Sequence, residues 1–268
     1  MSITKQLALR HLKQNKSRSV LTVLGITISV VMLTVIFTCA TSFAHYYGER
    51  AINTNGNWHF FVKTDYESAK KGIRASLEKS GLEYFDLYLL HQACGDYFSA
   101  WRAMEDAYKK GLLKAIGVSN FYPNILTNFC EVVKVKPVVN QVELHPYYTQ
   151  EKALETMKYY NVIPEAWAPL GGGRYNPFED EMLKEIAEKH NKTVGQVILR
   201  WNIQRGVVVI PKSTHVERIK ENIDIFDFEL NEEEMKQISS LDMGYSGSRA
   251  KHFEPDFVRM VLNNKIHD

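Results

Sequence analysis

Cysteine is scarce in this 268-residue sequence, and so are the features that usually separate domains. The three cysteines, Cys39, Cys94 and Cys130, are widely spaced and odd in number, so they form neither a disulfide framework nor a metal-binding motif. This usage fits a fold that evolved in a reducing compartment. The sequence also lacks an internal repeat, a low-complexity tract and a Gly/Ser- or Pro-rich linker.

Basic charge is concentrated at the N-terminus and is scarce elsewhere. Residues 1–18 carry five Lys or Arg and no acidic residue, whereas the remainder has 28 basic and 31 acidic residues, a formal charge of −3. No basic stripe therefore remains outside the N-terminal segment, which argues against nucleic acid as a partner.

Residues 19–44 contain no formally charged side chain. A helix of about 20 apolar residues crosses a bilayer, so this stretch is long enough to span one with tilt. The preceding basic residues predict an N-terminus held in the cytoplasm; they are Lys5, Arg10, Lys13, Lys16 and Arg18. A signal peptide, with an apolar region of about 7 to 15 residues, and a buried core helix are the alternatives. Length and uniform apolarity favour an uncleaved membrane helix over about 19–44.

Further along the chain, apolar runs alternate with polar loops and amphipathic stretches. We expect strands within Phe85–Gln92, Lys114–Phe121, Val138–Pro146, Val162–Leu170 and from Val207 onwards. We expect helices near Tyr97–Lys110, Pro123–Val133, Gln150–Tyr160, Phe178–His190 and Thr193–Gln204. Strands that alternate with helices of this length predict βαβ units and a parallel sheet.

Each expected strand ends in a polar or aromatic residue. These residues are His91, Ser119 and Asn120, Asn140 and Gln141, Trp167, and Lys212 and Ser213. Such a ring at the carboxyl ends of successive strands is typical of the active site of a (β/α) barrel.

The last apolar run leads directly into a cluster suited to phosphate. Lys212 and Ser213 follow the strand, and Arg218 comes five residues after the serine. A lysine gives a point charge, a serine a hydroxyl donor and an arginine a bidentate fork. The alternative is an ordinary strand end with solvated charges.

Several motifs together resemble the aldo-keto reductases. They are LLHQ, GVSNF, NQVELHP, AWAPL and IPKS followed by ERIKEN, in the order and spacing of that family, from about Tyr66 to the C-terminus. The resemblance implies an NADPH-dependent barrel enzyme that reduces a small aldehyde or ketone.

The resemblance also implies a role for individual residues. His91 would orient the substrate carbonyl. Trp167 would stack on the nicotinamide, where the family usually has Tyr. The carboxamide of the nicotinamide would be held by Ser119, Asn120 and Gln141. Contacts to the 2′-phosphate would come from Lys212, Ser213 and Arg218, and contacts to the adenine from Glu221 and Asn222.

Each of these residues also has a purely structural interpretation. A lone histidine after an apolar strand is more often a satisfied core residue than a catalyst, so His91 gains its weight from the surrounding motifs. Trp167 could simply pack the barrel, because aromatic side chains bury large areas. Asn120 and Gln141 could satisfy backbone groups at the strand ends.

The proton donor expected of the family is missing. In that family a Tyr protonates the carbonyl oxygen, with its pKa lowered by a Lys that is paired with an Asp. An unperturbed phenol, with a pKa near 10, is a poor acid at neutral pH. Lys63, in HFFVKT, is the candidate for the lysine, although the loop to the next helix is shorter than in the family. Tyr47 only faintly echoes the tyrosine motif, because Ser42 occupies the place of the Asp.

The barrel-like part is short, and no first or second barrel strand is recognisable. Residues 66–268 number 203, against roughly 250 for a typical eight-stranded barrel. We therefore expect an α/β fold: an incomplete (β/α)8 TIM barrel of five or six strands, lacking its first strands and preceded by one long apolar helix. Exposed sheet edges would require cover from the membrane segment, a partner chain or a rearranged N-terminus.

Residues 1–60 resemble the N-terminus of FtsX-like ABC transporter permeases, with a basic amphipathic segment before the first membrane span. The expected domains are thus a permease-like segment, 1–60, and a reductase-like barrel, 61–268. A single span would anchor the protein in the membrane with the barrel outside the cytoplasm, although the reductase portion resembles cytoplasmic enzymes. Two alternatives to an impaired reductase remain: a permease fragment with an inert tail, and a fusion without function.

Overall fold

The computed structural model describes residues 65–248, 252 and 254–263. The chain divides after His59, and all described residues belong to the unit Phe60–Asp268. The expected membrane helix, the permease-like segment and Lys63 lie outside the described residues, so their predictions stay predictions. Within the part that is described, no helix has the length and apolarity needed to cross a membrane.

A parallel sheet forms the centre of the described part, as the alternating pattern predicted. Its five strands follow one another in chain order: β1 (Tyr88–Leu90), β2 (Ile116–Ser119), β3 (Val139–Glu143), β4 (Ile163–Trp167) and β5 (Val208–Val209). Every strand pairs in parallel with the next, for example Val118 with Asn140 and Ala166 with Val209. The strands are shorter than the apolar runs, since the ends of those runs continue into loops.

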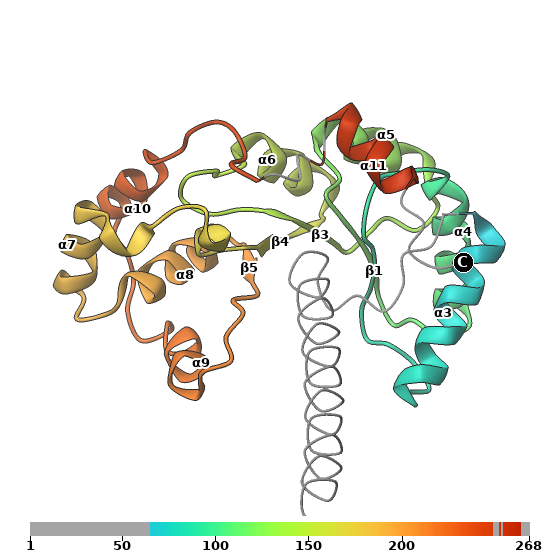
Figure 1. Ribbon diagram of the computed structural model, residues 1–268, viewed down its shortest axis with the longest axis horizontal. Helices are drawn as coiled ribbons and strands as arrows, with labels where there is room; N and C mark the ends of the chain where they lie inside the picture. Colours follow the sequence, from blue (N-terminus) through green and yellow to red (C-terminus); the bar gives the residue numbers. More distant parts are fainter. Residues whose placement is uncertain (1–64, 249–251, 253, 264–268) are drawn as a thin grey trace, which may run out of the picture. The chain divides into compact units, whose positions relative to one another are not determined.

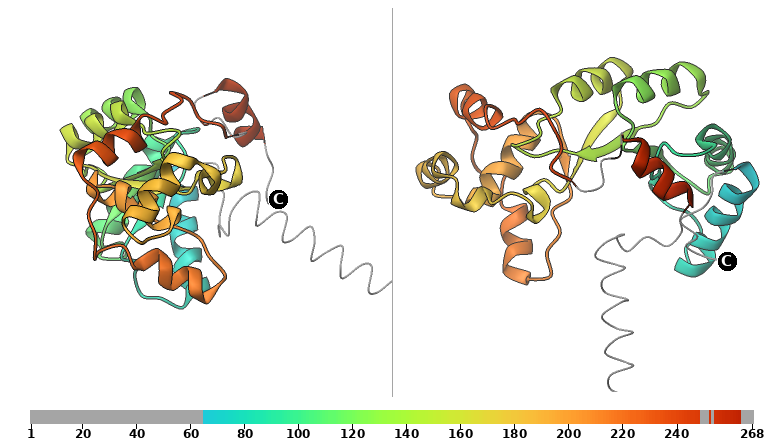
Figure 2. Two further views of the ribbon diagram at one scale, coloured as in Figure 1. Left: turned by 90° about the vertical axis from the view of Figure 1, so that its left-hand side faces the viewer. Right: turned by 45° about the horizontal axis from the view of Figure 1, so that its top comes forward.

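Helices precede, connect and follow the strands, and those that connect strands lie on the outer side of the curved sheet (Figures 1 and 2). They are α3 (Tyr66–Ser80), α4 (Tyr97–Lys109), α5 (Pro123–Val132), α6 (Glu151–Tyr160), α7 (Glu181–Lys189), α8 (Val194–Gln204), α9 (Val216–Ile223), α10 (Glu232–Ser239) and α11 (Pro255–Asn263). Two short 3-10 helices, η1 (Gly171–Gly173) and η2 (Pro177–Glu179), follow β4. The five expected helices are all present, whereas α9, α10 and α11 were not predicted.

Side-chain caps fix where several helices begin. Asp65, Asp96 and Asp180 each accept a hydrogen bond from a backbone N–H in the first turn of α3, α4 and α7. Thr193 and Asn231 form complete capping boxes at α8 and α10. These caps satisfy backbone donors that have no partner inside the helix.

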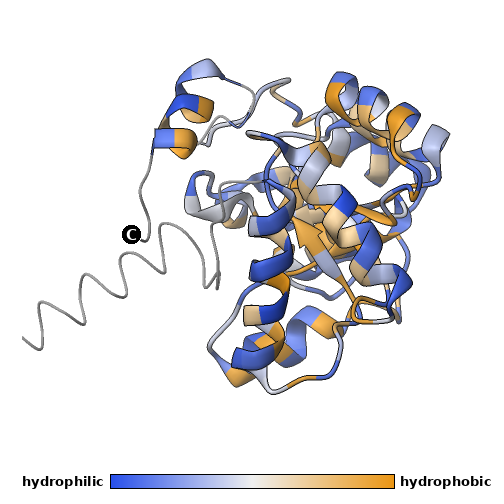
Figure 3. Ribbon diagram, turned by 90° about the vertical axis from the view of Figure 1, so that its right-hand side faces the viewer, coloured by the Kyte–Doolittle hydropathy of each residue, from blue (hydrophilic) through white to orange (hydrophobic). Residues whose placement is uncertain are grey.

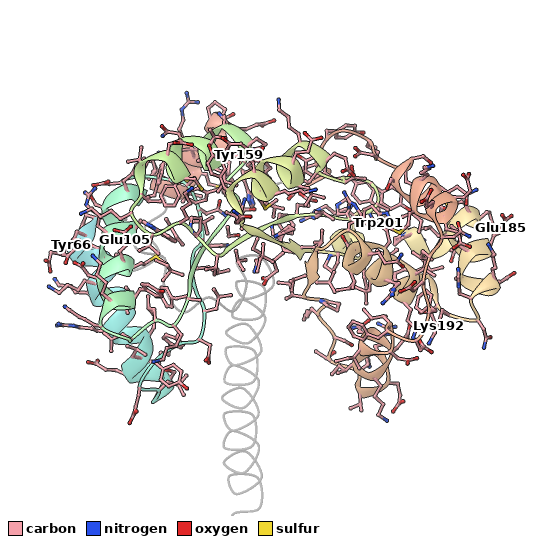
Figure 4. All side chains as sticks on the ribbon, turned by 180° about the vertical axis from the view of Figure 1, so that it is seen from behind. Tyr66, Glu105, Tyr159, Glu185, Lys192 and Trp201 are labelled. Carbon is pink, nitrogen blue, oxygen red and sulfur yellow. The ribbon has the colours of Figure 1, made fainter. Side chains whose placement is uncertain are left out.

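The apolar core lies between the sheet and the helices. Trp101, Phe121 and Phe129 are fully buried, and the ring centroids of Trp101 and Phe129 are 5.1 Å apart in an edge-on arrangement. In Figure 3 the strands are mainly apolar, while the helices alternate apolar and hydrophilic residues along their length. The core also holds Glu105 of α4, whose carboxylate accepts hydrogen bonds from the N–H groups of Lys134 and Val135 (Figure 4).

The sheet does not close into a barrel within the described residues. Among the strands described, β1 and β5 each pair on one side only. Helix α9, which follows β5 in the chain and contacts α8, buries none of its residues. Four large apolar side chains on or just after it are exposed: Val216, Ile219, Ile223 and Phe226. An open, barrel-like parallel sheet of five strands therefore agrees with the lower strand number expected from the sequence.

Candidate active site

The carboxyl ends of β1, β2, β3 and β4 meet around Asn120. The side-chain amide of Asn120 donates to the carbonyl oxygen of His91 at 3.4 Å, and its Oδ1 accepts from the indole N–H of Trp167 at 2.9 Å. Its backbone has a φ of 59°, a conformation that Asn tolerates better than most residues. Asn120 thus ties the loop after β1 to the end of β4, and brings together residues singled out in the sequence.

The neighbouring polar residues extend this network. Ser119 Oγ donates to the carbonyl oxygen of Gln141 at 2.8 Å and accepts from the Asn120 amide at 3.1 Å. The Gln141 side chain donates to Glu165 Oε1 at 2.5 Å. Glu165 was not predicted, because it lies within an apolar strand where the sequence gives no sign of its direction. Asn140 hydrogen-bonds to the backbone N–H and carbonyl oxygen of Phe121.

His91 is held in the neutral form at physiological pH. Burial lowers its pKa to about 4, because the charged imidazolium loses hydration. A neutral imidazole offers one N–H donor and one acceptor nitrogen. At pH 7 His91 can therefore donate a hydrogen bond to a carbonyl oxygen without bringing a net charge to the site.

A separate cavity of about 580 Å³ lies at the end of β5 and gathers all five residues predicted for the adenosine phosphate end. These are Lys212, Ser213, Arg218, Glu221 and Asn222, and the opposite wall includes Ala168, Pro169 and two glycines of η1. Within the described part of the chain, neither Lys212 nor Arg218 is engaged in an ion pair, so both cations are available to an anion. Thr193 Oγ1 donates to Glu221 and fixes its carboxylate from α8.

The chemistry of this donor set fits a phosphorylated nucleotide. Two exposed cations and a hydroxyl suit a phosphomonoester, and a carboxylate with an amide nearby suits the donor and acceptor edge of a purine. Ser213 Oγ also accepts from the backbone N–H of His215 at 3.1 Å, which shapes the turn before α9. Ala168, the residue after Trp167 in the chain, lines the cavity, so the cavity lies near Trp167.

Comparison with known proteins decides the family. The model of the Aldo/keto reductase family matches residues 50–243. The chain belongs to the aldo/keto reductase family. The match begins ahead of Tyr66 and inside the segment assigned to a permease-like domain, which corrects the expected start of the likeness. Its end, at residue 243, leaves the remaining C-terminal residues outside the matched range.

Individual relatives of this reductase family member are similar over the same region. Glyoxal reductase of Bacillus subtilis (strain 168) is 48% identical over 178 residues, which cover 66% of this chain and 64% of that protein. The 9,11-endoperoxide prostaglandin H2 reductase of Trypanosoma cruzi is 46% identical over 179 residues, covering 66% and 63%. This chain thus spans less than two thirds of the length of these curated relatives.

Solved structures agree with this assignment. An aldo-keto reductase from a Medee basin deep-sea metagenome library has a TM-score of 0.67 and 42% identity, covering 68% of this chain and 69% of that one. The Bombyx mori aldo-keto reductase in complex with NADP has a TM-score of 0.67 and 33% identity, covering 74% and 73%.

A buried polar cluster around Glu143 was not predicted from the sequence. Glu143 is 1% exposed and faces His145, whose Nε2 is 3.2 Å from the carboxylate, and Arg174, whose guanidinium is 3.4 Å away. Ser246 donates a hydrogen bond to the other carboxylate oxygen. Burial alone would raise the pKa of Glu143, but the hydrogen bonds from His145 and Ser246 lower it overall. The motif NQVELHP contained Glu143, but nothing in its spacing distinguished it from the nearby amides.

Proposed function

We propose that this chain is an NADPH-binding oxidoreductase that reduces small aldehydes or ketones. The observation that carries the proposal is the cavity at the end of β5, which collects five predicted cofactor residues from the loop after β5 and from α9. NADPH, when bound, supplies a hydride to a carbonyl carbon. Relatives named glyoxal reductase and methylglyoxal reductase suggest substrates among small carbonyl compounds.

The residues of the chain divide into two groups in this proposal. Lys212, Ser213 and Arg218 would hold the 2′-phosphate. The adenine would be held by Glu221 and Asn222. The second group would place the nicotinamide end: Ser119, Asn120 and Gln141 by hydrogen bonds, Trp167 by its ring. The network around Asn120 supports this arrangement, because it fixes the rotamers of Ser119 and Trp167.

His91 would bind the carbonyl oxygen of the substrate. Its lowered pKa keeps it neutral at pH 7. It would therefore donate a hydrogen bond to the substrate without adding a positive charge to the site. No described residue matches the tyrosine that donates the proton in the family, and Lys63 lies outside the described residues. We therefore propose that turnover is slow relative to intact family members.

Cofactor binding tests the proposal directly. Titration of the full chain with NADPH, followed by nicotinamide fluorescence, should saturate. Arg218→Ala and Lys212→Ala each remove a charge-assisted phosphate contact worth about 1.5 to 3 kcal/mol, so NADPH affinity should fall about 10- to 150-fold. NADH, which lacks the 2′-phosphate, should be much less affected.

A matched variant separates the phosphate site from general charge. Lys220→Ala removes an exposed lysine from the same helix, where it pairs with Glu217 at 3.1 Å and does not line the cavity. NADPH affinity should stay within about twofold in this variant. Equal losses of NADPH and NADH affinity in Arg218→Ala would contradict the assignment of the cavity.

A further inference from the structure

A row of polar side chains crosses three neighbouring strands on one face of the sheet. In the register of the parallel pairs, Ser119 of β2 lies opposite Gln141 of β3, and Gln141 lies opposite Glu165 of β4. Residues at paired positions of neighbouring strands have their side chains on the same face of a sheet. The hydrogen bond of 2.5 Å from Gln141 Nε2 to Glu165 Oε1 joins the last two members of this row.

This row faces away from the helices. The strand residues that alternate with it belong to the core between the sheet and the helices, and they are Val118, Val142 and Ala166, all fully buried. Because successive side chains of a strand point to opposite faces, Gln141 and Glu165 lie on the concave face of the sheet (Figure 2). Trp167, two residues after Glu165, lies on the same face. The row is therefore part of the side of the sheet proposed to hold the nicotinamide.

Glu165 is an unusual residue for this position. It is 9% exposed, and among the described residues its carboxylate forms no ion pair and no hydrogen bond other than the one from Gln141. A carboxylate is rarely buried without a cation, because burial removes its hydration. Its one described contact, with Gln141, indicates what this carboxylate does.

The contact with Glu165 determines which end of the Gln141 amide faces the rest of the site. A carboxylate has acceptors only, so it meets the amino end of the amide and not the carbonyl end. With Nε2 engaged by Glu165, Oε1 of Gln141 points elsewhere, and no described residue donates a hydrogen bond to it. Gln141 therefore offers an acceptor whose direction is set by the neighbouring carboxylate.

The other two residues proposed at this end of the cofactor are already bonded within the described network. The Asn120 amide nitrogen donates to the carbonyl oxygen of His91 and to Ser119 Oγ, while its Oδ1 accepts from Trp167. The hydroxyl of Ser119 donates to the backbone of Gln141. In this set, Gln141 Oε1 is the acceptor without a described donor. The amino group of a bound carboxamide can supply that donor.

We propose that Glu165 is a positioning residue that makes the site selective for the amide on the nicotinamide ring. By holding the amino end of Gln141, it directs Oε1 toward the amino group of the bound carboxamide. Glu165 acts through Gln141 and does not itself contact the cofactor. This inference rests on the proposed binding of NADPH.

A pair of cofactors that differ in one group provides the test. The acetylpyridine analogue of NADP⁺ has a methyl group in place of the amino group of the carboxamide, and both compounds carry the 2′-phosphate. In calorimetric titrations of the full chain, NADP⁺ should bind about 10-fold more tightly than the analogue, because the methyl group leaves Oε1 unpaired. The side chain of Glu165→Gln can meet either end of the Gln141 amide, so in this variant the ratio of the two affinities should fall below about threefold.

A double-mutant cycle shows whether Glu165 acts through Gln141. Gln141→Met removes the amide and should lower the ratio as far as Glu165→Gln does. Adding Glu165→Gln to Gln141→Met should then change the ratio no further, because no amide remains to be oriented. A merely structural role for Glu165 would weaken the binding of both cofactors alike and leave the ratio unchanged.

Glu143→Gln is the matched control. Glu143 is a second buried carboxylate on the same face, opposite Trp167 in the register, and it contacts His145 and Ser246 rather than Gln141. Its substitution removes the same charge and should leave the ratio as in the parent. Adenosine 2′,5′-bisphosphate, which has no nicotinamide, should bind the parent and every variant equally and so verifies that each is folded. Glu165→Met, which also lacks a carboxylate, should show the same fall in the ratio if Glu165→Gln does not fold.

The outcomes separate this inference from the function on which it rests. Failure of the parent to bind NADP⁺ would overturn both. If NADP⁺ binds, equal affinity of the parent for the two cofactors would overturn the role of Glu165 alone, and so would an unchanged ratio in Glu165→Gln. An equal fall of the ratio in Glu143→Gln would also overturn it, because the effect would then come from the loss of any buried charge on this face.

Discussion

At the scale of single residues, Asn120 carries much of the organisation of the site. Its amide contacts the backbone after β1, the hydroxyl of Ser119 and the indole of Trp167 at once. An asparagine side chain offers two donors and an acceptor, and it tolerates the left-handed backbone conformation. Asn120 can therefore adopt its positive φ and still place its side-chain amide in the network at the strand ends.

Two half-buried histidines are expected to make the protein sensitive to acid. The pKa values of His91 and His252 are each lowered to about 4 from the ordinary 6.5. Between these values the unfolded chain binds more protons than the folded one, so the free energy of unfolding falls as the pH drops from about 6.5 to 4. Their contribution is complete above about 6.5.

Chemical unfolding of the parent and of His252→Phe at pH 7.5 and 4.5 measures this effect. The parent should lose more stability on acidification than His252→Phe, which has one histidine fewer to protonate. An equal loss in the two proteins would show that burial of His252 does not persist in solution.

At the scale of elements, α10 is attached to α7 through one buried carboxylate. Glu234 completes the capping box of α10 and accepts hydrogen bonds from Lys189 and His190 at the end of α7. Burial alone would raise the pKa of Glu234, but the bonds from Lys189, from the Asn231 N–H and from His190 lower it to about 2. Glu234 is therefore ionised at any pH at which the protein is studied.

Glu234→Gln should reduce the free energy of unfolding by about 2 kcal/mol at pH 7, because charge-assisted hydrogen bonds in a buried position are lost. Glu232→Gln, at an exposed position of the same first turn, should change it by less than about 0.5 kcal/mol. Urea denaturation of both variants gives the comparison. The difference between parent and Glu234→Gln should shrink below about pH 4.5, as the parent loses the advantage of its lowered pKa.

The sequence predicted the elements that pair a buried apolar run with an amphipathic stretch and missed the short helices after β5. The five strands and the helices between them were placed correctly, because each pairs a buried run with an amphipathic stretch. Helix α10 begins at a capping box, Asn231 with Glu234, in a short charged stretch whose period is weak. Helix α11 follows a loop whose only visible signal is Pro255.

Site residues were predictable from the sequence where they follow a recognisable strand. Residues at strand ends, such as Asn120 and Lys212, are visible because the strand direction tells where they lie. Glu165 is inside a strand and was hidden by its apolar neighbours. The stacking of His252 on Trp167 depends on a segment folding back over the sheet, and such a long-range contact leaves no local pattern in the sequence.

At the scale of the whole molecule, we expect an exposed apolar face on α9 to influence association. On and just after α9, Val216, Ile219, Ile223 and Phe226 are between 52% and 71% exposed. A contiguous apolar surface of this kind promotes association. If these side chains remain exposed in solution, we expect the protein to self-associate through them.

Ile223→Lys places a charge on this face and tests its state. If the face is open to solvent, the melting temperature should change by no more than about 2 °C and light scattering on heating should decrease, since surface substitutions usually cost little. A loss of more than about 2 kcal/mol would instead show that another part of the protein covers Ile223. Glu217→Lys is the control for added positive charge, because Glu217 lies on the same helix but pairs with the charged Lys220.

The strictly sequential order of the sheet has a consequence for how this family can diversify. Because each strand pairs with its successor in the chain, an exchange of residues ahead of β1 alters contacts at one border of the sheet only. The cavity proposed to hold the nucleotide follows β5, at the opposite border, and none of its lining residues comes from β1 or from the helices next to it. We therefore expect substitutions in α3 or β1 to leave the lining of that cavity unchanged.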